Sequence, residues 1–132
     1  MAEFQSYKLE TPLKRVRGLG SAKSGTDHFW RQRLTAVALV PLTLAFVVIV
    51  IRTVGGDYDD VTSTLSHPLP ALLMLLFIGA GIMHMRIGMQ VIIEDYAHTE
   101  LSKITLLALN NFFSYALGLA CVFAVLKLSF GG

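Results

Sequence analysis

The chain has 132 residues, the length of one domain, and 54% of them are hydrophobic while only 15% are charged. A soluble domain of this size needs a more charged surface, and here the apolar residues lie in long blocks, so the composition predicts a bilayer-spanning chain. The net charge is +2, and seven of the eleven basic residues come before residue 34: Lys8, Lys14, Arg15, Arg17, Lys23, Arg31 and Arg33. They directly precede an apolar run, which favours a membrane-orientation signal over nucleic-acid binding, so no nucleic-acid partner is expected.

Residues 1–27 are expected to form a polar, basic arm on the cytoplasmic side of the membrane. The first apolar run begins only near Leu34, too far from Met1 for a secretory signal peptide. Thr26 and Asp27 are candidate capping residues for a helix that starts near His28.

The first predicted span covers residues 30–52. Its core, Leu34 to Ile51, is free of charge and would be about 27 Å long as a helix, close to the ~30 Å of a hydrocarbon core. Pro41 lies inside this span and is expected to kink it, because proline removes one backbone hydrogen bond. Residues 53–68, which carry three acids, are expected to form a loop.

Two more spans are predicted at residues 68–95 and 104–127, so the fold class is an all-α integral membrane protein with a three-helix domain at residues 28–132. Three spans place the two termini on opposite sides. The positive-inside rule predicts a cytoplasmic N-terminus and a periplasmic C-terminus.

The second span carries the most informative polar residues. His84 lies eleven residues before Asp95, so both share one helix face about 16 Å apart, and with Asp95 at the interface His84 is expected near the bilayer midplane. Gly81 and Gly88 flank His84 on the same stripe and would leave room for a flat haem macrocycle with the imidazole as iron ligand. The alternative is a histidine that hydrogen-bonds a neighbouring helix, with the glycines serving close packing.

Asp95 and Tyr96 are expected to end the same helix at the interface. A phenol can donate a hydrogen bond to a quinone carbonyl, and an adjacent carboxylate can orient it or relay protons. The simpler interpretation is an aromatic-belt tyrosine beside a solvated acid. Arg86 points to nearly the opposite face from His84 and is left unassigned, while Asn110 and Asn111 are expected to hydrogen-bond between helices.

Residues 84–96 (HMRIGMQVIIEDY) resemble the membrane anchor subunit of succinate dehydrogenase: a histidine, a glycine four residues later, and Asp-Tyr at the end of the second of three helices. Residues 28–36 (HFWRQRLTA) are similar to the start of the family's first helix. The resemblance covers about residues 28–100, and the third helix matches only in hydrophobicity.

The resemblance implies specific roles. His84 would be one axial ligand of haem b, whose other ligand would come from a cytochrome b subunit. Tyr96 would hydrogen-bond ubiquinone, Asp95 would support that site, and Arg33 would lie near the haem propionates or the quinone site. Arg33 could equally be a membrane anchor.

The partners implied are the cytochrome b subunit, an iron–sulfur subunit and a flavoprotein with FAD, in a bacterial inner membrane. FAD and the clusters must lie in those partners, because the chain has no Gly-rich dinucleotide motif and a single cysteine, Cys121. The chain is thus expected to be a non-catalytic subunit of an enzyme. The alternatives are a fumarate reductase anchor and a structural membrane subunit without a redox role.

Overall fold

The computed structural model describes residues 23–131, which form four helices: α2 (Lys23–Thr53), α3 (Tyr58–Ser66), α4 (Pro68–Tyr96) and α5 (Glu100–Ser129). Side chains are described from residue 26 onward. Three of the helices, α2, α4 and α5, are long and apolar enough to cross a membrane, which confirms the predicted all-α fold with three spans. Most of the expected basic arm, residues 1–22, lies outside the described residues.

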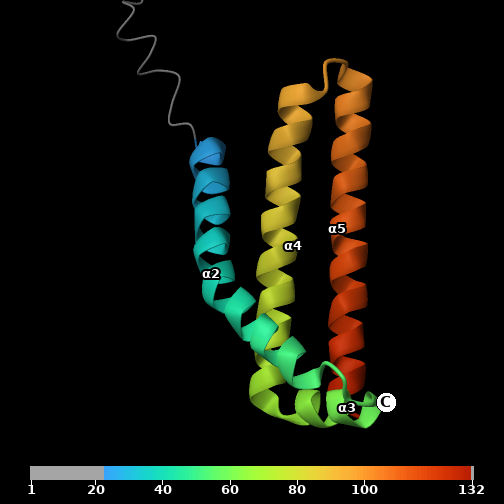
Figure 1. Ribbon diagram of the computed structural model, residues 1–132. Helices are drawn as coiled ribbons and strands as arrows, with labels where there is room; N and C mark the ends of the chain where they lie inside the picture. Colours follow the sequence, from blue (N-terminus) through green and yellow to red (C-terminus); the bar gives the residue numbers. More distant parts are fainter. Residues whose placement is uncertain (1–22, 132) are drawn as a thin grey trace, which may run out of the picture.

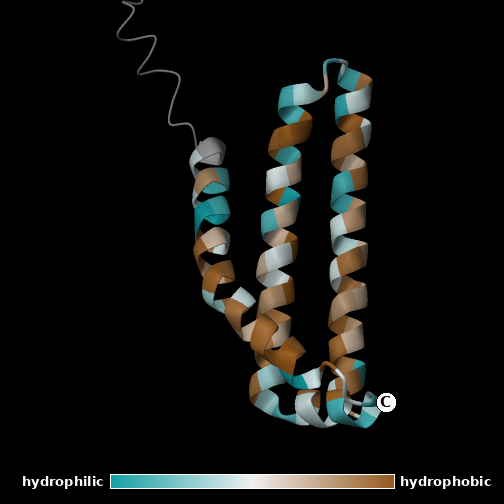
Figure 2. Cartoon of the chain, viewed as in Figure 1, coloured by the Kyte–Doolittle hydropathy of each residue, from teal (hydrophilic) through white to brown (hydrophobic). Residues whose placement is uncertain are grey.

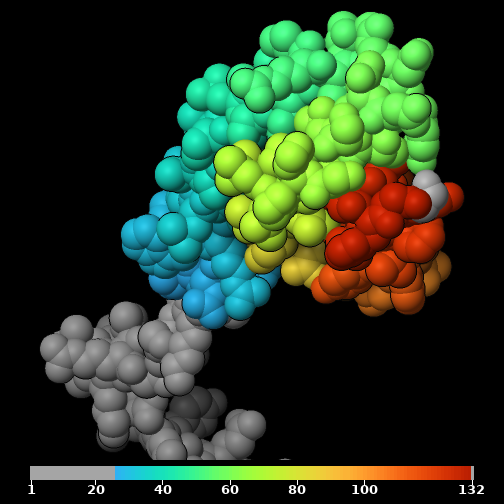
Figure 3. All heavy atoms as spheres, turned by 90° about the horizontal axis from the view of Figure 1, so that it is seen from below, coloured from blue at the N-terminus to red at the C-terminus, as the bar shows by residue number. Residues whose placement is uncertain are grey.

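The three long helices stand in a row (Figure 1). Helix α4 packs against α2 on one side and α5 on the other, whereas α2 and α5 make no contact with each other in the described part of the chain. Helices α4 and α5 run antiparallel and are joined at one end by residues 97–99, which we call the connector end. Helix α3 lies across the opposite end, and together with the start of α4 it covers much of that face (Figure 3).

Helix α2 begins at Lys23, so the expected start near His28 was wrong. Residues 23–27 continue the helix instead of belonging to the arm. The helix changes direction part-way along its length (Figure 1). The helix contains Pro41, which we take as the cause of the predicted kink. The proline ring clashes with the preceding turn, and its nitrogen has no hydrogen to donate to a backbone hydrogen bond.

The loop predicted at residues 53–68 contains helix α3, so that expectation is corrected. The helix starts after Asp57, whose backbone N–H donates to the Asp60 carboxylate at 3.0 Å, which secures the first turn. Leu65 is 5% exposed and anchors α3 against the long helices. The signal was weak because the helix has nine residues and many Ser, Thr and Asp, which also favour turns.

Few side chains are fully buried. Among the described residues, the buried apolar ones are Ile49, Leu65, Ile87, Ile93 and Val125. Large hydrophobic side chains are instead exposed along all three long helices, as expected for surfaces that contact lipid or other subunits. Hydrophilic residues recur on α4 and α5 in the half of the molecule next to the connector end, whereas the other half is mostly apolar down to α3 (Figure 2).

Candidate functional site

His84 of α4 faces α2 and is hydrogen-bonded to it. The Thr35 hydroxyl lies 3.1 Å from His84 Nδ1 and 2.7 Å from the carbonyl oxygen of Arg31. A hydroxyl has a single proton, which the short bond to the Arg31 carbonyl uses, so the hydroxyl accepts a hydrogen bond from Nδ1–H. This selects the tautomer in which Nε2 carries a free lone pair, the form that a metal-ligating imidazole requires.

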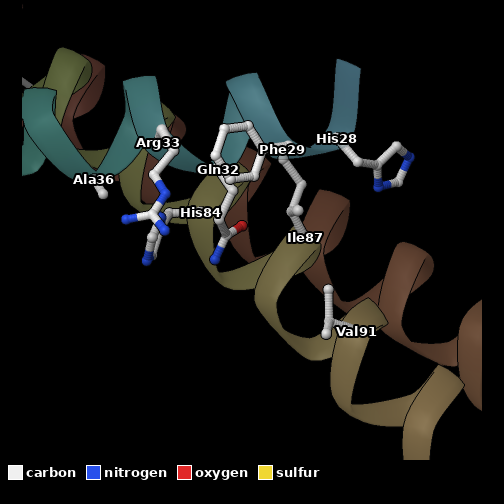
Figure 4. A pocket seen from close by; sticks show the side chains of 8 residues that line it. All are labelled: His28, Phe29, Gln32, Arg33, Ala36, His84, Ile87 and Val91. Atoms are coloured by element: carbon white, nitrogen blue, oxygen red, sulfur yellow. The ribbon is translucent and has the colours of Figure 1, made fainter. Parts of the chain in front are cut away.

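A cavity of about 520 Å³ lies between α2 and α4 beside His84 (Figure 4). This volume is within the range of small-molecule and cofactor sites. Figure 4 shows His84 and Arg33 close together at one end and His28 at the other. The remaining lining residues are largely apolar: Phe29, Gln32, Ala36, Ile87 and Val91.

Two polar groups of this cavity lack the partners they would normally have. The Arg33 guanidinium lies 5.2 Å from the centre of the Phe29 ring and forms no ion pair among the described residues. The Gln32 Oε1 atom is buried and receives no hydrogen bond within the same part of the chain. A buried amide oxygen without a donor indicates that water or another molecule completes the site.

The two glycines that flank His84 also face α2. A Cβ atom on Gly88 would lie 3.4 Å from Gln32 Nε2, and one on Gly81 would lie 3.9 Å from Leu39 Cδ2. Both glycines thus lie on the α2-facing side of α4, where an added Cβ would make ordinary van der Waals contact and a larger side chain would not fit. The open space beside His84 is lined by the neighbouring positions Ile87 and Val91.

The register of α2 against α4 indicates how deep His84 lies. Its partner Thr35 is the second residue of the apolar run 34–51, which is bounded by Arg33 and Arg52. His84 therefore lies near the connector-end boundary of the apolar layer. The midplane expectation took Asp95 as the interface, whereas the register of α2 against α4 points to a shallower position. Helix α4 has 29 residues, about 43 Å at ~1.5 Å per residue, and its last turns extend beyond a ~30 Å core.

Asp95 and Tyr96 end helix α4, and the structure does not bring them together with His84. Tyr96 is 76% exposed and lines a second cavity, of about 450 Å³, formed where α4, the connector and α5 meet. His98 and Ser102 line this same cavity. Asp95 is exposed and lines neither cavity, although it is the next position after Val91 on the His84 stripe.

The residue left unassigned, Arg86, lies at the α4–α5 contact. Its Nη1 donates to the Tyr115 hydroxyl at 2.8 Å and, at a longer 3.4 Å, to Asn111 Oδ1. Asn110, 8% exposed, donates from Nδ2 to the Arg86 carbonyl oxygen at 3.0 Å. Both asparagines thus bond between helices as predicted.

Sequence reasoning missed two polar residues that line the His84 cavity, His28 and Gln32, and it missed Thr35, which hydrogen-bonds His84. Thr35 and Gln32 are spaced three apart and His28 lies seven before Thr35, so one stripe of α2 carries them all. That polar stripe was a detectable signal. What the sequence did not provide was the alignment of α2 against α4, which decides that this stripe meets His84.

Comparison with known proteins agrees with this architecture. The family model described as the succinate dehydrogenase/fumarate reductase transmembrane subunit matches residues 8–126. A succinate dehydrogenase hydrophobic membrane anchor subunit of Paracoccus denitrificans is 34% identical over 92% of this chain and 93% of its own length. The protein of the same description from Rickettsia bellii is 29% identical over 91% and 96%, respectively. A succinate dehydrogenase membrane anchor subunit of Reclinomonas americana is 38% identical over 62% and 71%.

No solved structure matches the chain significantly. The family model nevertheless spans most of the sequence, and the three apolar helices make this a multi-pass membrane protein. The chain therefore belongs to the family of succinate dehydrogenase/fumarate reductase transmembrane subunits.

Proposed function

We propose that this chain is the membrane anchor subunit of a succinate dehydrogenase and that His84 supplies one axial ligand to haem b. The observation that carries the ligand assignment is the Thr35 hydroxyl bound to His84 Nδ1, which leaves the Nε2 lone pair beside a cavity of about 520 Å³. Within the described residues Nε2 has no hydrogen-bond partner that would compete for this lone pair.

The residues of the cavity fit a haem. Imidazole is a common axial ligand of b-type haem iron, Phe29, Ile87 and Val91 offer an apolar wall, and the unpaired Arg33 guanidinium can bind a propionate. Bound there, the haem would supply a one-electron carrier. His84 would orient and hold it, and Thr35 would fix the imidazole ring.

The second axial ligand would come from a partner subunit. His28 lines the same cavity but lies at the end away from His84 (Figure 4), so it is not the expected second ligand. Within the described residues no cluster of three or more His, Cys, Asp or Glu side chains could hold a metal ion. The relatives' description as membrane anchor subunits supports an assembly with other subunits. We propose that these are a cytochrome b subunit, an iron–sulfur subunit and an FAD-containing flavoprotein.

We assign the quinone contact to Tyr96. Its phenol lines the second cavity, where a hydroxyl donor can bind a ubiquinone carbonyl, and the adjacent Asp95 carboxylate is exposed to water and can pass protons to this region. Both residues lie beyond the apolar layer at the connector end, where a hydrophilic electron donor can reach them. From the positive-inside rule we infer that this end is cytoplasmic and that the C-terminus lies in the periplasm of a bacterial inner membrane.

The haem assignment is tested by the absorption spectrum of the purified complex. The His84→Ala variant should lose most of the reducible b-type Soret and α bands, because no other imidazole replaces the ligand. His67→Ala is the matched control, since His67 is exposed at the start of α4, at the end of the helix away from the connector. Unchanged bands in His84→Ala would remove the ligand role and favour the structural alternative.

The quinone assignment is tested by comparing two activities. Tyr96→Phe should lower succinate:ubiquinone reductase activity, whereas succinate oxidation with an artificial dye should persist, because the dye takes electrons before the membrane subunits. Tyr58→Phe, at the opposite end of the molecule, should leave both activities unchanged. If Tyr96→Phe keeps full quinone reduction, the assignment is wrong. To distinguish a succinate dehydrogenase anchor from a fumarate reductase anchor, the rates of succinate oxidation and fumarate reduction by the whole complex are compared.

A further inference from the structure

Arg86 is a charged side chain on a membrane-spanning helix, and its known contacts do not neutralise it. The guanidinium donates to Tyr115 and Asn111, both uncharged, and its carbon lies 5.4 Å from the Tyr115 ring centre. It forms no ion pair within the part of the chain that the structure describes. A charged side chain on a membrane-spanning helix is costly unless it is paired or reaches the interface, so a negative group from outside the chain is expected.

The depth of Arg86 limits what that group can be. Arg86 lies two residues after His84, toward the connector end, and His84 is level with Thr35 near the boundary of the apolar layer. An arginine side chain can extend several ångströms toward the interface while its aliphatic part stays in apolar surroundings. The guanidinium is therefore within reach of the phosphate layer of that leaflet.

An apolar groove begins on the same side of α4. Arg86, Met83, Gly79 and Leu76 follow one another at intervals of three and four residues and so share one face of the helix. The last three line a groove of about 620 Å³ between α4 and α2, with apolar side chains and Thr35 making up the rest. The groove runs from Met83, one helical turn from Arg86, toward Leu76 and the middle of the apolar run.

We propose that this face binds an anionic phospholipid. Its phosphate accepts hydrogen bonds from the Arg86 guanidinium, which Tyr115 and Asn111 hold in place, and one acyl chain occupies the groove along Met83, Gly79 and Leu76. Charge complementarity at the top of the groove and apolar lining below it match the two parts of a lipid. The site is separate from the His84 and Tyr96 cavities, which lie on other parts of the α4 surface.

The test uses the intact purified complex in a neutral detergent. Native mass spectrometry counts bound dioleoylphosphatidylglycerol and, in a parallel sample, dioleoylphosphatidylcholine at equal concentration. The parent complex should bind the anionic lipid preferentially, and Arg86→Gln should weaken that binding about tenfold through loss of a charge-assisted contact. Arg86→Lys should keep most of the preference. Lys103→Gln removes a positive charge elsewhere on α5 and should bind lipid like the parent.

Tyr115→Phe provides a second variant in case Arg86→Gln does not assemble, because it keeps the charge and removes only the 2.8 Å hydrogen bond. It should weaken anionic lipid binding by a smaller factor, about threefold. Inorganic phosphate should not displace the lipid, since it cannot fill the groove. Three results would overturn the proposal. The parent complex could bind both lipids equally, or Arg86→Gln and Tyr115→Phe could bind the anionic lipid like the parent. The third is that Arg86→Gln loses a partner subunit while its lipid binding stays the same.

Discussion

Replacing Thr35 with valine removes one atom's hydrogen bonds and leaves the side-chain shape nearly unchanged. The lost contact between helices is the 3.1 Å bond between Thr35 Oγ1 and His84 Nδ1, and the hydroxyl's 2.7 Å bond to the Arg31 carbonyl oxygen within α2 is lost with it. A single neutral hydrogen bond contributes about 1 kcal/mol to stability, so the fold should survive the change. For a metal-binding histidine the effect is larger, because the partner fixes both ring orientation and tautomer, and its loss typically lowers affinity about 10–100-fold.

We therefore expect Thr35→Val complexes to retain less haem per flavin than the parent after purification. The remaining haem should have a more positive midpoint potential, because an imidazole without an N–H acceptor is a weaker donor to ferric iron. Haem is measured as the pyridine haemochrome and the potential by optical redox titration. Thr35→Ser keeps the hydroxyl and is the matched control. Equal haem content and potential in the valine and serine variants would refute the proposed role of Thr35.

Two further changes test the packing around α4. Gly88→Leu should separate α2 from α4 and reduce haem retention, because a Cβ at this position already lies 3.4 Å from Gln32 Nε2 and leucine is larger still. Gly79→Leu is the control: no atom lies within 4 Å of a Cβ at that position, so this variant should keep the haem. Equal retention in the two leucine variants would contradict this. Asn110→Leu should lower stability by about 1 kcal/mol through loss of the bond to the Arg86 carbonyl, seen as a lower Tm of the complex in detergent; an unchanged Tm would contradict it.

The sequence predicted the long helices well because each must satisfy its own backbone hydrogen bonds in lipid and so needs a continuous apolar run. The ends were less predictable. Helix α2 extends to Lys23, where polar residues carry no apolar signal, and α3 consists largely of residues that favour turns as much as helices. Both errors concern segments whose helical state depends on capping and on contacts with other helices.

The site was predicted only where its residues lie on one helix. The spacing of His84, Asp95 and Tyr96 follows from α4 alone, and their helical placement agrees with it. The depth of His84 and the role of Thr35 depend on how far α2 is shifted along α4, which no single-helix argument contains. The bond from Arg86 to Tyr115 has the same origin, since it joins positions 29 residues apart in the sequence.

The row arrangement of the long helices has a consequence for biogenesis. Because α2 touches α4 but not α5, the hairpin of α4 and α5 can form in the bilayer without it. Without α2 the cavity beside His84 lacks one wall, since Phe29, Gln32 and Arg33 all belong to α2, so the docking of α2 is the step that creates the cavity.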